Sequence, residues 1–256
     1  MASVRLSVVI PAYNEAAVIG QTLRAIATHL TTAGVAHEIL VVDDGSTDQT
    51  SQVVLDVAKT LPAIRVVRSA HRGKGAAVRQ GVFEAQGEEV LFMDADHSTR
   101  IEEWQKCWPW LHDGYEMVIG SRKMSGAMVT VHQPRLRELM GKGFTWLTNT
   151  LLAIRVTDIT CGFKGFQASA AREMFQLQRI EGWGFDAEVL FIARRLGYRI
   201  KEVPVVWTND TRTKVRLLKD TVRSFRELLK ICLGAWRGWY PRQPVRTPPE
   251  QARSPR

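Results

Sequence analysis

Cysteine is scarce in this chain: of 256 residues only Cys107, Cys161 and Cys232 are cysteines, and no two form a CxxC pair. A disulfide framework and a cysteine zinc site are therefore excluded, and this usage fits a reducing compartment. No apolar run is long enough to span a bilayer. The first residues lead directly into an apolar run without a signal-peptide pattern, so we expect a mature cytosolic protein.

Two common nucleotide-binding motifs are also missing. The sequence contains neither GxxxxGK[ST] nor GxGxxG, which disfavours a P-loop NTPase and a nicotinamide dehydrogenase. Hydrophobic residues make up 45% and charged residues 24%, an ordinary balance that excludes wholesale disorder and collagen-like structure. The length predicts one domain, or one domain with an appendage.

The positive charge is confined to one end of the chain. Residues 1–211 contain 23 Lys+Arg and 23 Asp+Glu, whereas residues 212–256 contain 12 Lys+Arg and only three acidic residues, so the net charge of +9 lies in this last segment. Such asymmetry indicates a segment that meets an anionic partner, either a membrane or a nucleic acid. The alternative is a solvated basic tail.

The first half alternates short apolar runs with stretches of helical periodicity. The apolar runs are rich in β-branched residues, as buried strands are, and the stretches between them repeat apolar residues every three or four positions. This alternation predicts an α/β fold whose mostly parallel sheet is flanked by helices on both faces. The predicted strands cover residues 6–11, 38–42, 64–67, 90–93 and 117–119, and the predicted helices cover 15–30, 47–59, 75–86 and 101–111.

The second half is less regular, and its clearest feature is basic and amphipathic. In residues 215–236, apolar residues recur at spacings of three and four, and lysines and arginines follow the same spacing. We expect a C-terminal helix whose basic stripe lies about a third of a turn from its apolar stripe. Residues 185–196 predict another helix, and residues 198–207 a strand or strand pair broken at Pro204. Prolines and arginines dominate residues 237–256, which predicts a disordered tail.

Polar clusters follow three of the predicted strands at their carboxyl ends, where ligands bind in open α/β sheets. Because carboxyl ends of parallel strands share one edge, we expect three acidic groups to converge there. The clusters are Tyr13-Asn14-Glu15, Asp43-Asp44 and Asp94-Ala95-Asp96.

The two acidic pairs suggest different chemistry. Asp94 and Asp96 can together hold a hard divalent cation such as Mg²⁺ or Mn²⁺, which prefers oxygen ligands and often shares them with phosphates. A solvated turn is the alternative, because this short motif is weakly specific. Asp43 and Asp44 can accept hydrogen bonds from a nucleobase or ribose, or can form a turn and a helix cap.

Two basic segments are expected near the same edge. Arg72-Gly73-Lys74-Gly75 opens a predicted helix, where glycines, cations and the helix N-terminus favour anions. Arg122 follows the fifth predicted strand, and its guanidinium can hold a phosphate with two parallel hydrogen bonds. The alternative for Arg122 is an ordinary surface arginine.

Read in order, these runs resemble glycosyltransferase family 2, and the likeness implies its GT-A fold, a Rossmann-like sheet. The runs are SVVIPAYNEAAVIGQTL, ILVVDDGSTDQT, RGKGAAVRQG, VLFMDADHST and VIGSR. Later runs resemble the branch acting on polyprenyl phosphates, first its dolichyl-phosphate glucosyltransferases and second its dolichol-phosphate mannosyltransferases; they are TDITCGFKGF (157–166), WGFDAEVLFIARRLGYRIKEVPVVW (183–207) and TKVRLLKDTVRSFRELLKI (213–231). The resemblance implies a GT-A catalytic domain over residues 1–211, followed by the basic helix over 212–236.

The resemblance also implies roles for matching positions. Asp94 and Asp96 would bind the metal, and Asp96, Arg122 and Asp158 would be catalytic, with Arg122 on a phosphate and Asp158 orienting the acceptor. Lys214 would close over the diphosphate. The nucleotide-sugar-binding residues, with Lys74 among them, would be Pro11, Ala12, Tyr13, Glu15, Val42, Asp43, Asp44, Lys74, Asp94, Ala95, Asp96, Arg122 and Lys214.

The implied reaction is an inverting, metal-dependent transfer of a hexose, glucose before mannose, from a nucleoside-diphosphate sugar to a polyprenyl or dolichyl phosphate. Negative charge grows on the leaving diphosphate, and a divalent cation (Mg²⁺ or Mn²⁺), Arg122 and Lys214 would stabilise it. The acceptor phosphate is already anionic, so positioning would matter more than a strong general base.

A membrane-embedded acceptor gives the basic helix a function, because Lys and Arg beside an apolar face suit an anionic membrane surface. Residues 144–154 are a candidate second interfacial helix. Many relatives in this branch carry transmembrane helices, whereas this sequence has no apolar run of that length. We therefore expect a peripheral protein on the cytoplasmic face of a membrane, held by its own helix or by a separate membrane protein. The alternative is that the helix packs on the catalytic domain.

Two rival functions belong to other classes. A basic nucleic-acid-binding module is compatible with the arginine-rich tail, but it leaves the acidic edge unexplained, so no nucleic acid is expected. A catalytically silent relative that recruits partners would bind nucleotide sugar without turnover.

Overall fold

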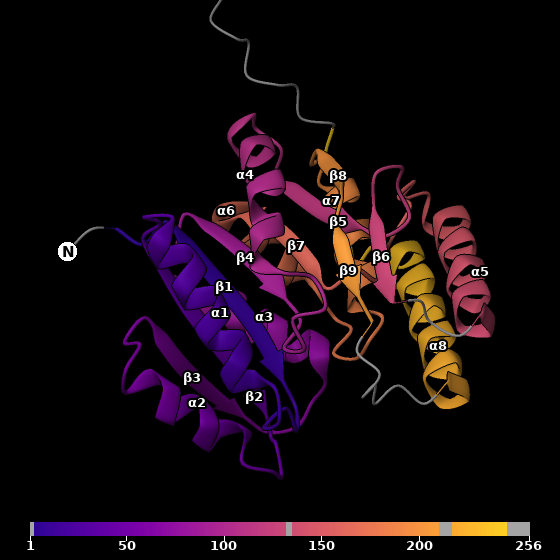
Figure 1. Cartoon of the computed structure of the whole chain (residues 1–256). Coiled ribbons are helices and arrows are strands. Elements are labelled where there is room, and N and C mark those ends of the chain that lie inside the picture. The colour runs from indigo at the N-terminus through magenta and orange to yellow at the C-terminus, as the bar shows by residue number, and fades with distance from the viewer. Residues whose placement is uncertain (1–2, 132–134, 210–216, 245–256) are drawn as a thin grey trace, which may run out of the picture.

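A seven-stranded sheet with the order β3-β2-β1-β4-β7-β5-β8 forms the centre of the molecule (Figure 1). The computed structural model describes residues 3–131, 135–209 and 217–244, and the side chains of 135–137 and 217–221 are not described either. The strands are β1 (Leu6–Ala12), β2 (His37–Asp44), β3 (Ile64–Ser69), β4 (Glu89–Met93), β5 (Met117–Ser121), β7 (Phe163–Gln167) and β8 (Ile200–Pro204).

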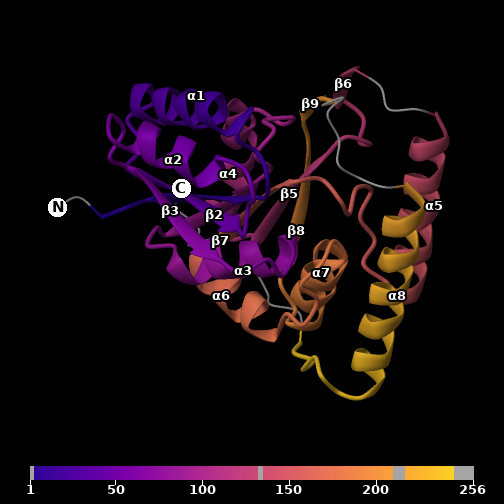
Figure 2. The same ribbon diagram turned by 90° about the horizontal axis from the view of Figure 1, so that it is seen from below.

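Helices cover both faces of this sheet (Figure 2). One face carries α1 (Ile19–Thr32), α2 (Thr50–Ala58) and α4 (Trp104–His112), and the other carries α3 (Lys74–Glu84), α6 (Ala168–Leu177) and α7 (Phe185–Arg195). Neighbouring strand residues enter different cores, because side chains alternate across a strand: Val9 belongs to one core and Val8 to the other. The predicted α/β fold with a mostly parallel sheet is confirmed, and residues 101–103 form a short 3-10 turn before α4.

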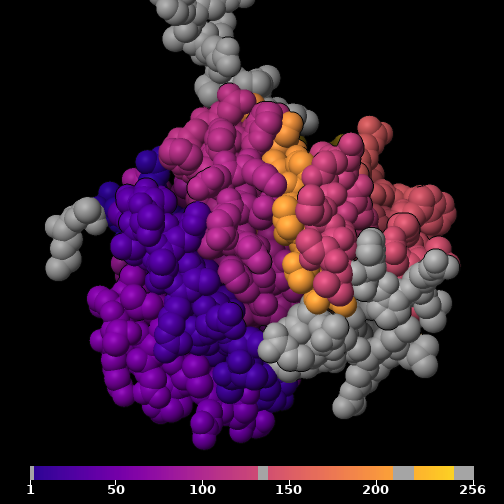
Figure 3. All heavy atoms as spheres, viewed as in Figure 1, coloured from indigo at the N-terminus to yellow at the C-terminus, as the bar shows by residue number. Residues whose placement is uncertain are grey.

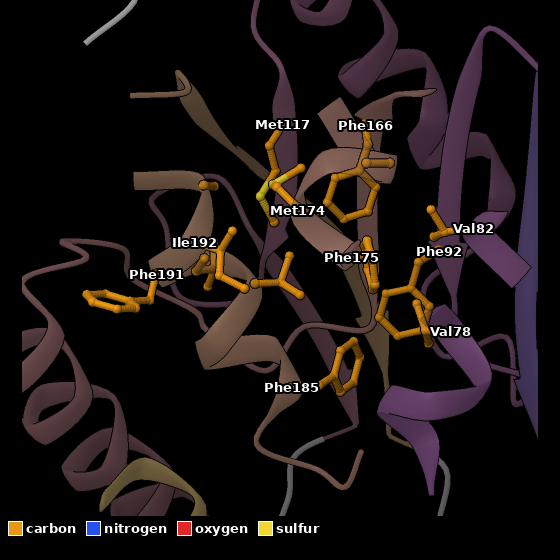
Figure 4. Close-up of a cluster of buried hydrophobic side chains, with 14 of the residues drawn as sticks. Val78, Val82, Phe92, Met117, Phe166, Met174, Phe175, Phe185, Phe191 and Ile192 are labelled. Atoms are coloured by element: carbon orange, nitrogen blue, oxygen red, sulfur yellow. The ribbon is translucent and has the colours of Figure 1, made fainter. Parts of the chain in front are cut away.

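Phenylalanine rings pack among aliphatic side chains in the core between the sheet and α3, α6 and α7 (Figure 4). Phe92 of β4 meets Phe185 of α7 edge to face, with ring centroids 5.6 Å apart. Phe166 of β7 meets Phe175 of α6 in the same way at 5.8 Å. Such edge-to-face pairs add to the stabilisation from apolar burial, so this core fixes β4 and β7 beside each other.

Strand β7, which the sequence did not reveal as a strand, runs antiparallel between β4 and β5, both of which pair with it. Its first residue, Phe163, lies opposite Met93, the last residue of β4. An antiparallel strand begins at the edge where its neighbours end. The loop of residues 153–162 before β7 therefore enters the edge that carries the carboxyl ends of β4 and β5.

Two long helices lie side by side outside the sheet (Figures 1 and 2). They are α5 (Arg135–Leu152) and α8 (Leu217–Trp236), and Phe144 of α5 meets Phe225 of α8 edge to face at 6.0 Å. The helix predicted over 215–236 corresponds to α8, and residues 212–216 lie outside the described residues. A small parallel sheet of β6 (Met128–Val131) and β9 (Val206–Thr208) lies at the surface in Figure 3. Strand β9 overlaps the strand pair predicted over 198–207 and ends one residue beyond it.

The prediction of a disordered tail from residue 237 is wrong for residues 237–244. Tyr240 is 1% exposed, and its hydroxyl donates a hydrogen bond to the Glu188 carboxylate at 2.6 Å. Its ring meets Phe191 edge to face at 5.4 Å, and its carbonyl accepts from Arg195 at 2.7 Å. Tyr240 therefore anchors the chain after α8 to α7, and the Gln243 backbone N–H adds a hydrogen bond to the Arg195 carbonyl at 2.8 Å; residues 245–256 lie outside the described residues.

Removing this anchor should destabilise the protein. We expect Tyr240→Ala to lower the free energy of unfolding by about 3–5 kcal/mol, the usual cost of truncating a buried aromatic side chain. Tyr240→Phe keeps the ring and loses only the hydrogen bond to Glu188, so its cost should be smaller, about 1–3 kcal/mol. Denaturant unfolding measures both, and an unchanged stability of Tyr240→Ala would mean that the segment is not docked.

Candidate active site

The carboxyl ends of β1, β2 and β4 meet at one edge of the sheet, as predicted. In the parallel register Ala12 lies beside Asp43, and β4 pairs with the other side of β1. Strand β5 ends at the same edge, because β4 and β5 both run antiparallel to β7. We call this edge the rim; it consists of residues 12–15, 43–48, 71–75, 94–98, 120–123 and 157–162.

An aromatic pair lies at the outer end of the rim. Tyr13 stacks on His71 with ring centroids 4.2 Å apart, and 38% of Tyr13 is exposed. The next residue, Asn14, adopts the left-handed conformation (φ 56°), and its side-chain oxygen accepts a hydrogen bond from the Thr47 backbone at 2.8 Å. The loops after β1 and β2 are thus held together, with a flat aromatic surface beside them. Of the predicted nucleotide-binding residues that precede these loops, Pro11, Ala12 and Val42 are buried, and Glu15, in the loop after β1, is half-buried.

Asp43 and Asp44 are buried and accept hydrogen bonds from the backbone around them. Asp43 accepts from the Ser46 backbone N–H at 2.9 Å. Asp44 accepts from the backbone N–H groups of Arg72 at 2.8 Å and Gly73 at 2.9 Å. Gly73 is needed here, because its φ of 124° is accessible mainly to glycine and a Cβ would lie 2.6 Å from the Glu181 carbonyl oxygen. Asp44 therefore holds the turn that delivers Lys74 to the rim.

Lys74 forms an ion pair with Asp94 beside Asp96. Its Nζ lies 2.7 Å from Asp94 Oδ1, and it also lies 5.0 Å from the centroid of the Trp183 ring. Burial opposes the lysine charge, but Asp94 and Asp186 outweigh it and raise the pKa of Lys74. Burial and the neighbouring Asp94 carboxylate raise the pKa of Asp96. Lys74 therefore does not fully balance the negative charge of the Asp94-Asp96 pair.

A second ion pair lies beneath the first. Lys164 of β7 is 1% exposed, and its Nζ lies 2.5 Å from Asp186 Oδ1. The same ammonium donates to the Cys161 carbonyl at 2.5 Å. Burial raises the pKa of Asp186, although Lys164 and Lys74 act against it. Asp186 thus shares its charge between a buried lysine and the lysine of the rim, and the sequence analysis identified neither Lys164 nor Asp186.

Arg122 and Asp158 form a two-point ion pair on the β5 side of the rim. Arg122 Nε lies 2.6 Å from Asp158 Oδ2, and Arg122 Nη2 lies 2.8 Å from Asp158 Oδ1. Asp158 is fully buried, whereas 19% of the Arg122 side chain is exposed. Burial opposes both charges, but the pairing prevails: it raises the pKa of Arg122 and, with Lys123, lowers that of Asp158. Trp207 lies against the guanidinium, 5.3 Å from ring centroid to Cζ.

This geometry changes the role expected of Asp158. Its two oxygens already bind Arg122, and no part of the residue is exposed. An acceptor could not reach it without breaking a buried ion pair, which is strongly unfavourable. Asp158 is accordingly placed to hold Arg122 rather than to contact a substrate itself.

The Asp94-Asp96 pair fits a divalent cation that shares its ligands with a bound phosphate. Among the described residues, no group of three His, Cys, Asp or Glu side chains could hold a metal ion, so a closed structural metal site does not fit. Two half-buried carboxylates are hard oxygen ligands of the kind that Mg²⁺ and Mn²⁺ prefer. Burial and the neighbouring Asp94 carboxylate both raise the pKa of Asp96, so a cation bound here would stabilise its charged form.

The structure thus brings the acidic clusters and both basic segments to one edge. Ala95 is buried in the turn between the two carboxylates, and its carbonyl accepts from Thr22 at 2.8 Å. Lys214 lies outside the described residues. Sequence reasoning missed Lys164, Asp186 and Trp207, whose partners are distant in sequence.

Comparisons with known proteins identify the family. The model of the glycosyl transferase family 2 domain matches residues 7–175. The chain is 33% identical over 251 residues to the dolichyl-phosphate beta-glucosyltransferase of Homo sapiens, covering 91% of this chain and 78% of that protein. The enzyme of the same name from Saccharomyces cerevisiae is 33% identical over 258 residues, covering 92% and 76%.

Solved structures show the same fold at lower identity. The glucosyl-3-phosphoglycerate synthase of Mycobacterium tuberculosis in complex with UDP has a TM-score of 0.67 and 23% identity, covering 89% of this chain and 80% of that one. Its complex with Mn²⁺ and UDP-glucose has a TM-score of 0.65 and 22% identity, covering 89% and 79%. The mannosyl-3-phosphoglycerate synthase of Rubrobacter xylanophilus has a TM-score of 0.68 and 21% identity, covering 91% and 74%.

The negative charge of Asp96 should destabilise the folded protein when no metal ion is bound. Because its pKa is raised in the fold, the unfolded chain loses this proton at lower pH, and stability falls as pH rises toward the folded pKa. Asp96→Asn removes the charge and keeps an oxygen for the Ser98 backbone N–H. We therefore expect a higher Tm than wild type at neutral pH without metal.

Asp56→Asn is the control, because Lys59 and Gln52 lower the pKa of exposed Asp56 by hydrogen bonding. This change should leave the Tm equal or slightly lower. Scanning calorimetry in chelator at several pH values measures both variants. A Tm of Asp96→Asn below wild type at neutral pH would contradict the unbalanced charge at the rim.

Proposed function

The chain belongs to glycosyltransferase family 2, and from this premise we propose that it transfers glucose from UDP-glucose to a dolichyl or related polyprenyl phosphate, inverting the anomeric carbon. The names of the curated relatives specify glucose and dolichyl phosphate, and structural neighbours contain Mn²⁺ and UDP-glucose. The observation that carries the proposal is the rim itself, where the Asp94-Asp96 pair shares one edge of the sheet with two cationic side chains, Lys74 and Arg122.

The donor diphosphate would lie along the Lys74 side of the rim. Asp94 and Asp96 would hold a divalent cation, which would supply positive charge and Lewis acidity beside the diphosphate oxygens. Lys74 would add a fixed positive charge, held in place by Asp94, Asp186 and the Trp183 ring. Tyr13 would present its exposed ring to the nucleoside. Charge that develops on the leaving diphosphate would thus meet side chains already oriented toward it.

The acceptor phosphate would meet Arg122. A guanidinium with Asp158 at one edge and the Trp207 ring near its face is held in one orientation, and its exposed part remains able to bind a phosphate oxygen. The phosphate oxygen is the nucleophile and is already anionic near neutral pH, so no side chain has to remove a proton from it. Holding the two phosphates in line would supply much of the rate acceleration.

Transfer and its metal dependence can be tested with purified protein. Incubation with labelled UDP-glucose, Mn²⁺ or Mg²⁺ and dolichyl phosphate should yield a lipid-linked glucose, and chelator should abolish it. Asp96→Ala should lower kcat about 100-fold or more, since it removes part of the charge stabilisation of the transition state.

A screen of common nucleotide sugars in the same assay fixes the donor. If product formed only from GDP-mannose, the transferred sugar would be mannose and not glucose. A complete lack of lipid-linked sugar with every donor would contradict transfer, and full activity of Asp96→Ala would contradict the metal site.

We further propose that α5 and α8 dock this enzyme on an anionic membrane surface, where the acceptor lies. Exposed apolar side chains occur along both helices, among them Trp146 at 69% and Trp236 at 84% exposure. Exposed cations flank the apolar stripe of α8 at Arg226 and Lys230. Apolar side chains beside lysine and arginine suit the interface of a membrane with anionic headgroups. The apolar set is Leu139, Trp146, Leu151, Val222, Phe225, Leu229, Leu233 and Trp236.

No described helix is long and apolar enough to cross a membrane. The exposed apolar and basic side chains of α5 and α8 support peripheral attachment, which we propose on the cytoplasmic face, where the three free cysteines would stay reduced. The helix pair, or a separate membrane protein, would provide the attachment.

Vesicle binding distinguishes these modes. Wild type should sediment with vesicles containing anionic phospholipid and bind less to neutral vesicles, increasingly weakly as salt rises. Trp236→Ala should weaken binding about tenfold, because a tenfold change corresponds to about 1.4 kcal/mol and a buried aromatic contributes at least this much.

The matched control is Trp108→Ala, which removes a half-exposed tryptophan of α4, away from the helix pair. It should bind vesicles like wild type. Failure of the wild-type protein to bind anionic vesicles would contradict direct docking and favour a separate membrane-protein anchor.

A further inference from the structure

Glu202, on strand β8, receives a concentrated set of hydrogen bonds from the loop that leads into β7. The Thr157 backbone N–H donates to both of its carboxylate oxygens, at 2.8 and 2.9 Å. The Thr157 hydroxyl donates to the same carboxylate at 2.7 Å, and the Asp158 backbone N–H lies 3.3 Å from it. Hydrogen bonds to an ionised acceptor are stronger than those between neutral groups, so this single side chain fixes two successive residues of the loop.

The loop needs such a fixture because it has no regular structure of its own. No helix or strand covers residues 153–162, and two non-glycine residues in it, Ala153 and Arg155, have positive φ. Side chains from the sheet hold it instead: Glu202 from β8, and Ser121 from the end of β5, whose hydroxyl lies 2.7 Å from that of Thr157. Strands β5 and β8 pair in parallel, with Ile119 beside Glu202. The loop is therefore anchored to β5, whose end forms part of the rim, and to its neighbour β8.

What Glu202 holds in place is the partner of Arg122. Asp158 directly follows Thr157, and its fully buried carboxylate binds the guanidinium at two points and the Arg122 backbone N–H at 3.1 Å. A buried ion pair compensates for the loss of water only when its geometry is accurate. A small shift of the Asp158 backbone would therefore move or release the guanidinium. The chain of contacts runs from Glu202 through Thr157 and Asp158 to Arg122.

We propose that Glu202 is a positioning residue for glycosyl transfer, which sets the orientation of Arg122 through Thr157 and Asp158. This inference rests on the proposed function, in which Arg122 binds a phosphate. Glu202 contacts no substrate in this role. Its effect is to keep the Arg122 guanidinium in one orientation before the phosphate arrives.

The chain offers a matched control for a purely structural role. Glu116, just before β5, accepts a hydrogen bond from the Arg199 backbone N–H at 2.8 Å. Like Glu202, it fastens backbone near the β5-β8 pair through a carboxylate, but it lies at the amino ends of these strands, away from the rim. Glu116→Ala therefore removes the same kind of contact without touching the path to Arg122.

Steady-state kinetics test the effect on the reaction. Glu202→Ala should lower kcat/KM about 10- to 100-fold relative to Glu116→Ala, the range expected for slight misplacement of a binding group. Glu202→Gln keeps one carbonyl oxygen for Thr157 and should recover much of this loss. If Glu202→Ala does not fold, Glu202→Gln and Thr157→Val, which removes only the hydroxyl donor, should show smaller losses of the same kind.

A second readout is independent of activity. In nitrogen-15 NMR the Arg122 Nε–H, bonded to Asp158, should exchange slowly with water in wild type and in Glu116→Ala, and at least about tenfold faster in Glu202→Ala, because opening of the ion pair exposes it. Equal kinetics and equal Arg122 exchange in the two alanine variants would overturn the proposal. If wild type transfers no sugar, the proposed function fails, and the exchange measurement still decides whether Glu202 positions Arg122.

Discussion

The ion pair between Lys74 and Asp94 connects the fold to the chemistry of the rim, since it brings a cation beside two carboxylates that repel each other. Lys74 Nζ lies 2.7 Å from Asp94 Oδ1. This ion pair depends on a turn that Asp44 fixes by accepting hydrogen bonds from two backbone N–H groups. Burial and the Asp94 carboxylate raise the pKa of Asp96, and the charge of Lys74 opposes this rise without cancelling it. The folded protein thus keeps an incompletely balanced negative site, which suits a cation shared with a diphosphate.

The fold fixes this charge pattern instead of leaving it to mobile surface groups. Lys164 and Asp186 form a buried second layer below Lys74, and Asp158 holds Arg122 from below. Such preorganised charges reorganise little when charge moves during a reaction, which is how enzymes gain most from electrostatics. Lys123, which donates to Thr145 of α5 at 2.9 Å, also joins the rim to the helix pair proposed to dock on the membrane.

The first half of the fold and the location of the rim were predictable because their signals are local. Apolar runs identify β1 to β5, and the clusters at their ends fall on one edge because parallel strands end together. Strand β7 escaped detection because Lys164 and Gly165 interrupt its apolar residues, and the burial of Lys164 depends on its ion pair with Asp186, 22 positions later. Tyr240 escaped because its burial depends on contacts with α7, over 40 positions earlier. Burial of Asp158 likewise follows from tertiary pairing with Arg122, which no local pattern reveals.

The central claim is that Asp94 and Asp96 present a cation to a nucleoside diphosphate, with Lys74 beside them. Calorimetric titration of UDP into the protein, with Mn²⁺ and then with chelator, tests it most directly. The account predicts that Mn²⁺ tightens UDP binding at least about tenfold, equivalent to 1.4 kcal/mol. Equal UDP affinity with and without the metal would contradict it.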